Sequence, residues 1–340
     1  NKMSKKVVIS GYYGADNFGD ESILEVLIQR LKKDEADITV LSTNPEKTAK
    51  THGVNSVHSF KLGKVMNALS KCDILVSGGG SLLQDATSLK SLFYYLWVIF
   101  MAQFYKKQVL IFAQGIGPIN NKVGEFFTKK LLKNCRWISV RDDKSLFLLR
   151  GWGLKPELVC DPLYDLEVTG STPSNRVGIQ LRSFKSLTEK LLITLANRVA
   201  IEFADKEIEI YSFQDSLDLE VCQHFEQLLL SVNPNLKTTV ISGKTPKEII
   251  KLIASLEYMI AMRFHAILIA LKYGIKTLAI NYDYKIEAIC NDAKIPALSM
   301  LANEDYGYMF SRLKQLDHRA ILDYVNNKHF NWELFDLLVK

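Results

Sequence analysis

The sequence predicts an α/β protein made of two doubly wound lobes that face each other across a cleft. The chain has 340 residues, which is too long for one ordinary domain and comfortable for two. Short β-branched runs alternate with amphipathic stretches from end to end, a pattern typical of parallel sheets with crossover helices. The small, polar run Gly170–Asn175 contains a proline and is the best linker candidate. We therefore expect lobes at 1–170 and 171–317.

In the first lobe, strands and helices are expected to alternate. The expected strands are Lys6–Ser10, Ile38–Ser42, Ser56–His58, Ile74–Ser77, Val109–Ala113, Trp137–Val140 and Leu158–Cys160. The expected helices are Asp20–Lys33, Gly63–Ser70, Leu89–Tyr105, Val123–Lys133 and Asp143–Gly151.

The second lobe repeats this alternation. Its expected strands are Val177–Leu181, Ile208–Phe213, Thr238–Ile241, Tyr258–Ala261 and Thr277–Asn281. Its expected helices are Leu187–Phe203, Leu217–Leu230, Pro246–Ala254, Ala266–Tyr273 and Lys285–Ala293. The closing segment His318–Lys340 reads as one helix and is a candidate to pack back onto the first lobe.

Charge and cysteine content indicate which partners and which compartment to expect. The 43 Lys and Arg exceed the 37 Asp and Glu by six, a mild surplus that suits an anionic ligand or a membrane surface and does not indicate a nucleic-acid partner. The five cysteines are scattered without any C-x-x-C spacing, which favours a reducing compartment and argues against disulfides or a zinc site. Lys5 and Lys6 lead directly into a strand and not into an apolar signal sequence, so we expect a cytoplasmic protein.

The most hydrophobic run is Leu92–Ala102, which continues to Phe104 and ends at Lys106 and Lys107. It is shorter than the roughly 20 residues that cross a bilayer. Two interpretations stay open: a helix buried against the sheet, which is favoured, and a helix that lies on a membrane interface.

Three glycine turns follow strands of the first lobe: Gly11–Glu21, Ser77–Asp85 and Ala113–Pro118. Because the carboxyl ends of parallel strands meet at one sheet edge, these turns should bring their polar side chains together. Those side chains are Asn17, Asp20, Gln84, Asp85 and Gln114. Such a set suits sugar hydroxyls, although each turn by itself is explained by chain reversal, and Asp20 also fits the role of a helix N-cap.

A nicotinamide cofactor is excluded by two features. The spacing of Gly11, Gly14 and Gly19 is not G-x-G-x-x-G, and the second expected strand does not end in the acidic residue that binds ribose.

Basic side chains follow three strands of the second lobe. Arg182 ends the first strand of this lobe, Arg263 and His265 stand where a strand meets the helix Ala266–Tyr273, and Lys285 follows the strand Thr277–Asn281. A helix start offers unpaired N–H groups, so these cations predict a binding site for a small anion. His265 would place a proton donor inside that site. The alternatives are that Arg263 and His265 only tie loops together and that Arg182 and Lys285 are surface charges.

Several motifs together resemble the polysaccharide pyruvyltransferases, in particular the bacterial CsaB type. They are Gly11–Asp20, Ser77–Gly80, Gln114–Pro118, Ser139–Asp142, Asp161-Pro162 and Met262–Ala266, which span most of the chain in order. The resemblance is weakest over 172–245.

The resemblance implies a GT-B-like pair of Rossmann-like lobes and an enzyme that transfers pyruvate from phosphoenolpyruvate to a saccharide as a cyclic ketal. For the CsaB type, the acceptor is a lipid-diphosphate-linked precursor of a secondary cell wall polymer that contains N-acetylmannosamine, and its ketals anchor S-layer homology domains. Phosphoenolpyruvate is then a co-substrate, and no cofactor or metal is expected. Contact with the inner membrane face is a candidate interaction.

The resemblance also suggests roles for individual residues. Arg263, His265 and Lys285 would bind the donor, and Arg182 and Arg141 are further donor candidates. As a hypothesis for the mechanism, His265 protonates the methylene carbon of phosphoenolpyruvate, and Asp20 or Asp16 is the candidate base. The acceptor candidates are Gly14, Asn17, Asp20, Gly79, Gln84 and Gln114. Two alternatives are a GT-B glycosyltransferase that uses a nucleotide sugar and a non-catalytic saccharide-binding module.

Overall fold

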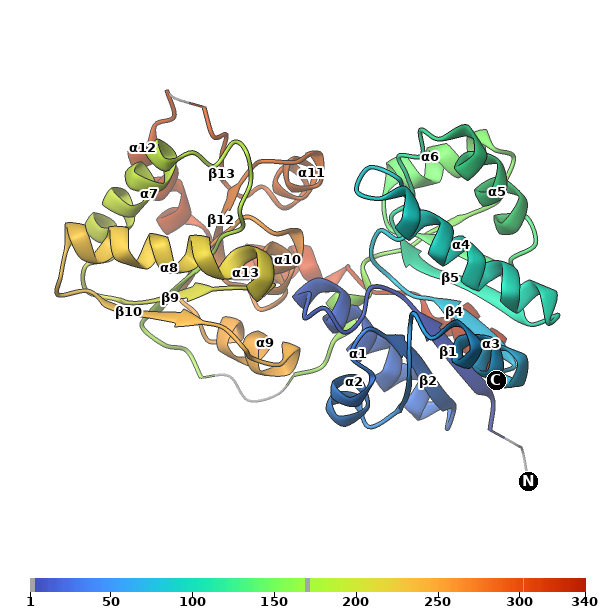
Figure 1. Ribbon diagram of the computed structural model, residues 1–340. Helices are drawn as coiled ribbons and strands as arrows, with labels where there is room; N and C mark the ends of the chain where they lie inside the picture. The colour runs from blue at the N-terminus through green and yellow to red at the C-terminus, as the bar shows by residue number, and fades with distance from the viewer. Residues whose placement is uncertain (1–3, 169–171, 302) are drawn as a thin grey trace. The chain divides into compact units, whose positions relative to one another are not determined.

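The computed structural model describes residues 4–168, 172–301 and 303–340 and divides the chain into two compact units (Figure 1). Unit 1 comprises the chain up to Leu166 together with His329–Lys340, and unit 2 comprises Glu167–Lys328. Part of the expected linker, residues 170 and 171, lies outside the described residues. Each unit contains one open parallel sheet with helices on both faces, so the predicted pair of α/β lobes is confirmed.

Unit 1 has a seven-stranded sheet in the order β3-β2-β1-β4-β5-β6-β7, in which all paired strands are parallel. The strands are β1 Lys6–Ser10, β2 Asp37–Ser42, β3 Asn55–His58, β4 Ile74–Ser77, β5 Gln108–Gln114, β6 Trp137–Val140 and β7 Glu157–Leu158. The strand order reverses between β1 and β4, which is where open α/β sheets bind their ligands.

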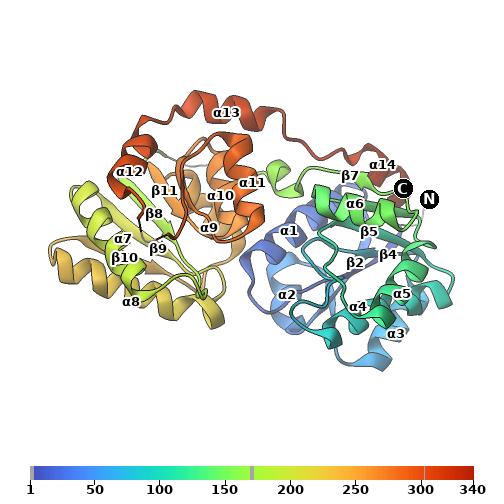
Figure 2. The same ribbon diagram turned by 90° about the horizontal axis from the view of Figure 1, so that it is seen from above.

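Helices cover both faces of this sheet. They are α1 Phe18–Lys33, α2 Pro45–His52, α3 Leu62–Lys71, α4 Leu89–Phe104, α5 Lys122–Leu132, α6 Asp143–Gly151, the 3-10 turn η1 Pro162–Asp165 and α14 Trp332–Val339. Helices α3, α4 and α5 lie side by side (Figure 2), and they share one apolar core with α6 and the sheet. Among the described residues, no helix is both long enough and apolar enough to cross a membrane.

Helix α14 belongs to unit 1 although it lies at the other end of the chain. On β5, Ile111 faces the α3–α5 core, and the next side chain, Phe112, faces the opposite way, as strand geometry requires. Phe112 stacks on Trp332 at 5.7 Å between ring centroids and contacts Phe335 at 5.4 Å. Arg30 of α1 donates to Asp336 of α14, and this hydrogen bond raises the pKa of Arg30.

Unit 2 has a six-stranded sheet in the order β10-β9-β8-β11-β12-β13, again with parallel pairs only. The strands are β8 Arg176–Gln180, β9 Glu207–Tyr211, β10 Lys237–Ile241, β11 Tyr258–Ala261, β12 Lys276–Ile280 and β13 Ala297–Leu298. The helices are α7 Glu189–Glu202, α8 Asp215–Val232, α9 Pro246–Ala254, α10 Phe264–Lys272, α11 Tyr284–Ala293, α12 Tyr306–Gln315 and α13 His318–Asn326. Here the strand order reverses between β8 and β11.

Helix α10 is the most deeply buried helix segment near that reversal. Its residues Ala266–Leu271 are all fully buried, and the helix contacts β11, β12, α9 and α13. A helix that is apolar all round belongs in a protein interior. The residues at its first turn therefore stand on a rigid element.

Three sequence-based expectations are wrong. Helix α1 begins at Phe18, and its N-cap is Asn17, whose side chain accepts the N–H of Asp20 at 3.1 Å. Asp20 is thus not the cap. Helix α2, strand β13 and helix α12 were not predicted, and the expected single helix 318–340 is two helices, α13 and α14. The segment between them is held by Asp165, whose carboxylate accepts the N–H of Phe330 at 2.8 Å.

A buried histidine links α2, α1 and the first glycine turn. The side chain of His52 is 1% exposed, with Nδ1 at 2.8 Å from Glu25 and Nε2 at 3.5 Å from Glu21. Glu21 also accepts the N–H of Gly14 at 2.8 Å, and Lys32 donates to the carbonyl of His52 at 2.6 Å. Burial lowers the pKa of His52, but hydrogen bonds and charges of Glu21 and Glu25 outweigh this and raise it above the ordinary 6.5.

We predict that His52→Asn destabilises the protein most at acidic pH. Because the folded state raises the pKa of His52, the imidazolium contributes stability that is fully present below pH 6.5 and is lost as pH rises through the folded-state value. Urea unfolding of wild type and variant across this pH range measures the difference. His224→Asn is the control, since that imidazole is 41% exposed. A difference between wild type and His52→Asn that does not vary with pH would contradict the assignment.

Candidate functional site

The two positions where strand order reverses define where each unit can hold a ligand. In unit 2, Arg182 lies just beyond β8, and Arg263 just beyond β11, on neighbouring strands. The backbone joins them: the N–H of Met262 donates to the carbonyl of Gln180 at 3.1 Å. In unit 1, the turns after β1 and β4 occupy the equivalent place. The sequence-predicted residues therefore lie at the sheet edges where α/β proteins bind ligands.

Arg263 is held in a buried ion pair that the sequence did not reveal. Its Nε and Nη2 donate to the two carboxylate oxygens of Asp218 at 2.8 and 2.7 Å, and the Asp218 side chain is fully buried. Its backbone N–H donates to the side chain of Gln180 at 2.7 Å. Such a two-bond pair fixes the plane of the guanidinium, and the carboxylate neutralises its charge. Arg263 is thus an oriented group and not an additional net positive charge.

Arg182 lies against a pair of aromatic rings, Tyr282 and Phe184, whose centroids are 4.8 Å apart. Its guanidinium carbon lies 5.4 Å from the ring centroid of Tyr282 and 5.7 Å from that of Phe184, and its Nη1 donates to the Tyr282 hydroxyl at 3.3 Å. The Nε atom is buried and has no hydrogen-bond partner within the described part of the chain. A buried donor without a partner is costly, so a ligand that supplies an acceptor there would relieve this cost.

His265 and Lys285 each stand in the first turn of a helix. His265 is half-buried on α10, where no described side chain caps the helix N-terminus, and its ring lies 5.3 Å from that of Phe264. Lys285 is half-buried on α11, which is capped by Asp283. Tyr282, which holds Arg182, comes two residues after β12 and leads into α11. All four predicted basic residues therefore lie at the carboxyl edge of the unit 2 sheet.

The glycines of unit 1 are explained by packing within the unit. Gly14 has φ +90°, and a Cβ there would lie 2.4 Å from Ser42 Oγ. A Cβ on Gly79 would meet Ile23 at 2.6 Å, and one on Gly80, with φ +91°, would meet the Asp20 carboxylate at 2.3 Å. These turns need glycine because a Cβ would clash with neighbouring side chains of the same unit, so the glycines alone do not indicate a ligand.

Several acceptor candidates point to local partners. Asp16 is 60% exposed and accepts from Lys47 at 2.7 Å. Both ends of the Gln84 amide bind Thr87, at 2.6 and 3.1 Å. Gln114 is fully buried and donates to the carbonyl and hydroxyl of Ser77. Asn17 caps α1. Each of these four side chains thus has a partner within unit 1, although Gln114 Oε1 is buried with no hydrogen-bond partner among the described residues.

Asp20 and Arg141 both lie at the turn after β4 in unit 1. The Asp20 carboxylate lies over Gly80, and the next residue, Ser81, accepts from Arg141 Nη2 at 3.3 Å. Nη1 of Arg141 is 4.0 Å from Asp161 and has no hydrogen-bond partner within the described part of the chain, although the side chain is only 10% exposed. Arg141 is thus a nearly buried cation with unused donor capacity, and it belongs to unit 1.

Tyr13 lies against the glycines of the same turns. Its ring and hydroxyl occupy the space that a Cβ on Gly11 or Gly78 would need. Burial, and then the charges of Asp20 and Glu21, raise the pKa of Tyr13 far above its usual value, so the phenol stays neutral.

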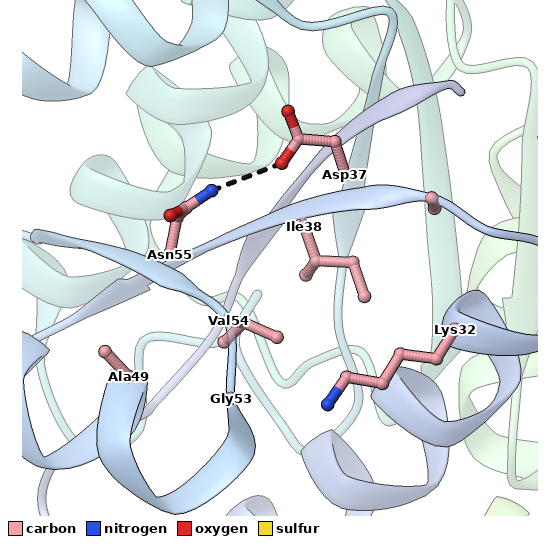
Figure 3. A pocket seen from close by; sticks show the side chains of 8 residues that line it. Lys32, Asp37, Ile38, Ala49, Gly53, Val54 and Asn55 are labelled. Carbon is pink, nitrogen blue, oxygen red and sulfur yellow. Dashed lines mark hydrogen bonds between the residues drawn. The ribbon is translucent and has the colours of Figure 1, made fainter. Parts of the chain in front are cut away.

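One pocket lies away from these edges (Figure 3). It encloses about 390 Å³ beside Asp37 and Asn55, at the amino ends of β2 and β3, and Figure 3 shows their hydrogen bond of 3.2 Å. Lys32, which lines it, already donates to the His52 carbonyl. Ligands of open parallel sheets bind at the carboxyl ends, so we assign this pocket no role.

The structure also describes possible metal ligands and the environment of four cysteine thiols. Within the described ranges, no group of three or more His, Cys, Asp and Glu is arranged to hold a metal ion. Burial raises the pKa of the Cys72 thiol to about 11 and that of the Cys135, Cys222 and Cys290 thiols to about 12. Protonated buried thiols are poor nucleophiles.

Comparison with protein families decides the class. Residues 17–284 match the model of a family described as polysaccharide pyruvyl transferase. The chain belongs to this family. It is therefore a transferase that carries a pyruvyl group to a polysaccharide. No curated protein matches the sequence of this transferase.

Solved structures share the fold of the transferase at low identity. A UDP-GlcNAc 2-epimerase from Neisseria meningitidis, bound to UDP-GlcNAc, has TM-score 0.62 and 11% identity and covers 99% of this chain and 100% of its own. A UDP-N-acetylglucosamine 2-epimerase from Rickettsia bellii has TM-score 0.63 and 12% identity, with coverage of 99% and 95%. An α-glucosyltransferase in complex with UDP and DNA has TM-score 0.59 and 12% identity, with coverage of 99% and 100%. These likenesses confirm the predicted GT-B-like fold.

The sequence analysis of the transferase missed Asp218 and Tyr282. These residues bind the side chains of Arg263 and Arg182, which it did identify. Asp218 shares one face of α8 with buried Cys222, Phe225 and Leu229, at helical spacing of four, seven and eleven residues. An acidic residue on an otherwise apolar stripe needs a buried cation, and that signal was available in the sequence. Tyr282 carried no comparable signal.

We predict that Asp218→Asn destabilises the transferase far more than Glu220→Gln, the corresponding change from carboxylate to amide at an exposed position of α8. Removing one partner of a buried pair leaves a cation uncompensated and costs about 3 kcal/mol of unfolding free energy. The exposed control should cost less than about 1 kcal/mol. Urea unfolding measures both, and equal losses would show that the Arg263 pair does not stabilise the corner between β11 and α10.

Proposed function

We propose that this transferase moves the pyruvyl group of phosphoenolpyruvate onto two hydroxyls of a saccharide as a cyclic ketal and releases phosphate. The observation that carries the proposal is the edge of the unit 2 sheet, where Arg182, Arg263, His265 and Lys285 meet the N-termini of α10 and α11. Family membership supports pyruvyl transfer, and these residues suit a small acid that carries a phosphate and a carboxylate.

The charges at this edge fit the donor. Phosphoenolpyruvate carries about three negative charges, from its phosphate and its carboxylate. Asp218 neutralises Arg263, so Arg263 would orient the donor with hydrogen bonds, and Arg182 would supply positive charge beside it. Lys285 is retained as a further donor-binding candidate. The buried Nε of Arg182, which lacks a protein partner within the described part of the chain, would gain an acceptor from the donor.

His265 would supply the proton for the first chemical step. Protonation of the methylene carbon converts it to a methyl group and makes the central carbon electrophilic, so a sugar hydroxyl adds there. The C–O bond to phosphate then breaks, and a neighbouring hydroxyl adds to the same carbon and closes the ketal. Of the two hydroxyl protons, one replaces that given by His265, and the other leaves with hydrogen phosphate.

Unit 1 would bind the acceptor, and Asp20 is the better of the two base candidates. Asp16 is exposed and paired with Lys47, whereas Asp20 lies over Gly80 at the point where strand order reverses. Arg141, with unused donors beside Ser81, is retained as a candidate for binding an anionic group of either substrate.

We further propose the CsaB-type role. The acceptor would be a lipid-diphosphate-linked precursor that contains N-acetylmannosamine, and the ketal product would serve secondary cell wall polymers that anchor S-layer domains. The reaction would take place in the cytoplasm, need no cofactor or metal, and continue in the presence of EDTA.

We predict that His265→Ala lowers kcat by roughly 10²–10⁴, since a positioned acid contributes this much. Arg182→Ala should mainly raise KM for phosphoenolpyruvate, because it removes a binding group and leaves the proton donor. Phosphate release with phosphoenolpyruvate and a panel of diphospho-saccharides measures both.

His224→Ala, an exposed imidazole on α8, is the matched control and should retain full activity. Turnover of UDP-sugars without phosphate release from phosphoenolpyruvate would replace the proposal with a glycosyltransferase. Acceptor binding without turnover of either donor would indicate a saccharide-binding module.

A further inference from the structure

Helix α4 carries an aromatic stripe on its outer side. Phe93, Trp97, Phe100 and Phe104 follow one another at spacings of four, three and four residues, so they share one face of the helix. Phe100 is 50% exposed and Phe104 is 66% exposed, while Leu92, Leu96 and Ile99 are buried against the sheet. The outer face of a surface helix is normally polar. This one is polar nowhere along its central three turns.

The neighbouring helix α5 extends the apolar surface. Val123, Phe126 and Phe127 are 55%, 58% and 42% exposed, and the two Phe rings lie 5.4 Å apart. Gly124 lets α5 approach α4 closely, since a Cβ there would lie 2.9 Å from Leu92. Gln103 of α4 donates to the Leu131 carbonyl of α5 at 2.8 Å. Figures 1 and 2 both show the two helices side by side. We call the exposed residues Phe100, Phe104, Val123, Phe126 and Phe127 the α4–α5 surface. Phe93 and Trp97 continue the stripe but are partly buried and pack against the core.

The positive charge of the whole chain is concentrated in the same segment. Residues 89–136 contain eight Lys and Arg and a single acidic residue, Glu125, whereas the complete chain has an excess of only six. The basic residues are Lys90, Lys106, Lys107, Lys122, Lys129, Lys130, Lys133 and Arg136. Lys90 precedes the aromatic stripe of α4, and Lys106 and Lys107 follow it. On α5, Lys122 and Lys130 stand one turn on either side of Phe126.

We propose that the α4–α5 surface docks the protein onto a membrane that contains anionic lipids. Exposed aromatic residues with lysines at both ends of each helix suit an interface where rings enter the acyl boundary and ammonium groups contact phosphates. The excess of positive charge in residues 89–136 favours an anionic membrane over a second copy of the chain. A symmetric contact with a second copy would press this strongly positive face against itself, and like charges would oppose it.

This inference does not use the proposed reaction, and its test contains neither substrate. The experiment is co-sedimentation of the complete protein with vesicles of equal parts phosphatidylcholine and phosphatidylglycerol, compared with pure phosphatidylcholine. We expect binding to the anionic vesicles only, weakening as salt rises because salt screens the lysines.

Two double variants locate the surface. Phe100→Ser with Phe104→Ser should weaken vesicle binding about tenfold, because two apolar side chains no longer enter the interface. Lys130→Gln with Lys133→Gln should weaken it by about fivefold for each lysine. All four positions are exposed in the free protein, so the fold should be retained, and circular dichroism checks this.

Matched controls in unit 2 are Ile201→Ser, a 67% exposed apolar residue, and Lys237→Gln with Lys251→Gln. These should bind vesicles as the wild type does. The proposal is overturned if the wild type does not bind anionic vesicles, if control and α4–α5 variants weaken binding equally, or if the aromatic variants convert a dimer to a monomer in light scattering without changing vesicle binding. Any effect of these variants on phosphate release is measured separately, so failure of the docking surface leaves the proposed reaction standing.

Discussion

The bidentate pair of Asp218 and Arg263 fixes the corner on which the unit 2 site depends. A carboxylate that is fully buried on α8 needs a counter-charge, and Nε and Nη2 of Arg263 donate to its two oxygens. The N–H of Gln214 donates to the same carboxylate. The contact of Asp218 with Arg263 sets the N-terminus of α10, and with it the position of His265. The same contact distinguishes Arg263 from the neighbouring Arg182, because the charge of Arg263 is paired with Asp218.

Much of the fold could be predicted because parallel sheets with crossover helices have a simple sequence pattern, in which short β-branched runs alternate with amphipathic stretches. Strands β1, β4 and β6 begin and end where the β-branched runs do, since both faces of each strand are buried. Helix α2 was missed for the opposite reason. It is polar and has little apolar periodicity, although Asn44, Pro45 and Gly53 mark its start and its end as cap, first residue and left-handed C-cap. The residues that begin and end helices were therefore present in the sequence of α2, although an apolar periodicity was not.

The candidate site was predictable in its position and not in its partners. Strand ends can be located from local sequence, so Arg182, Arg263, His265 and Lys285 could be assigned to one sheet edge. Whether a side chain at that edge already bonds to another residue of the protein depends on contacts between distant segments. Arg182, for example, donates to Tyr282, a hundred residues later. The same limit applies to unit 1, where Gln84 and Gln114 are occupied by Thr87 and Ser77. Their residue types suited a saccharide, but the amide of Gln84 and the amide nitrogen of Gln114 already have partners within unit 1.

The assignment of α14 to unit 1 has a consequence for how the protein is made. Phe112 on β5 is covered by Trp332 and Phe335, more than 200 residues further along the chain. During translation, α1 can cover its part of this sheet face early, whereas Phe112 stays uncovered until Trp332 and Phe335 have left the ribosome. Phe112 is therefore exposed on the nascent chain while the 220 residues from Phe112 to Trp332 are synthesised, and a chaperone that recognises apolar segments can bind there in that interval.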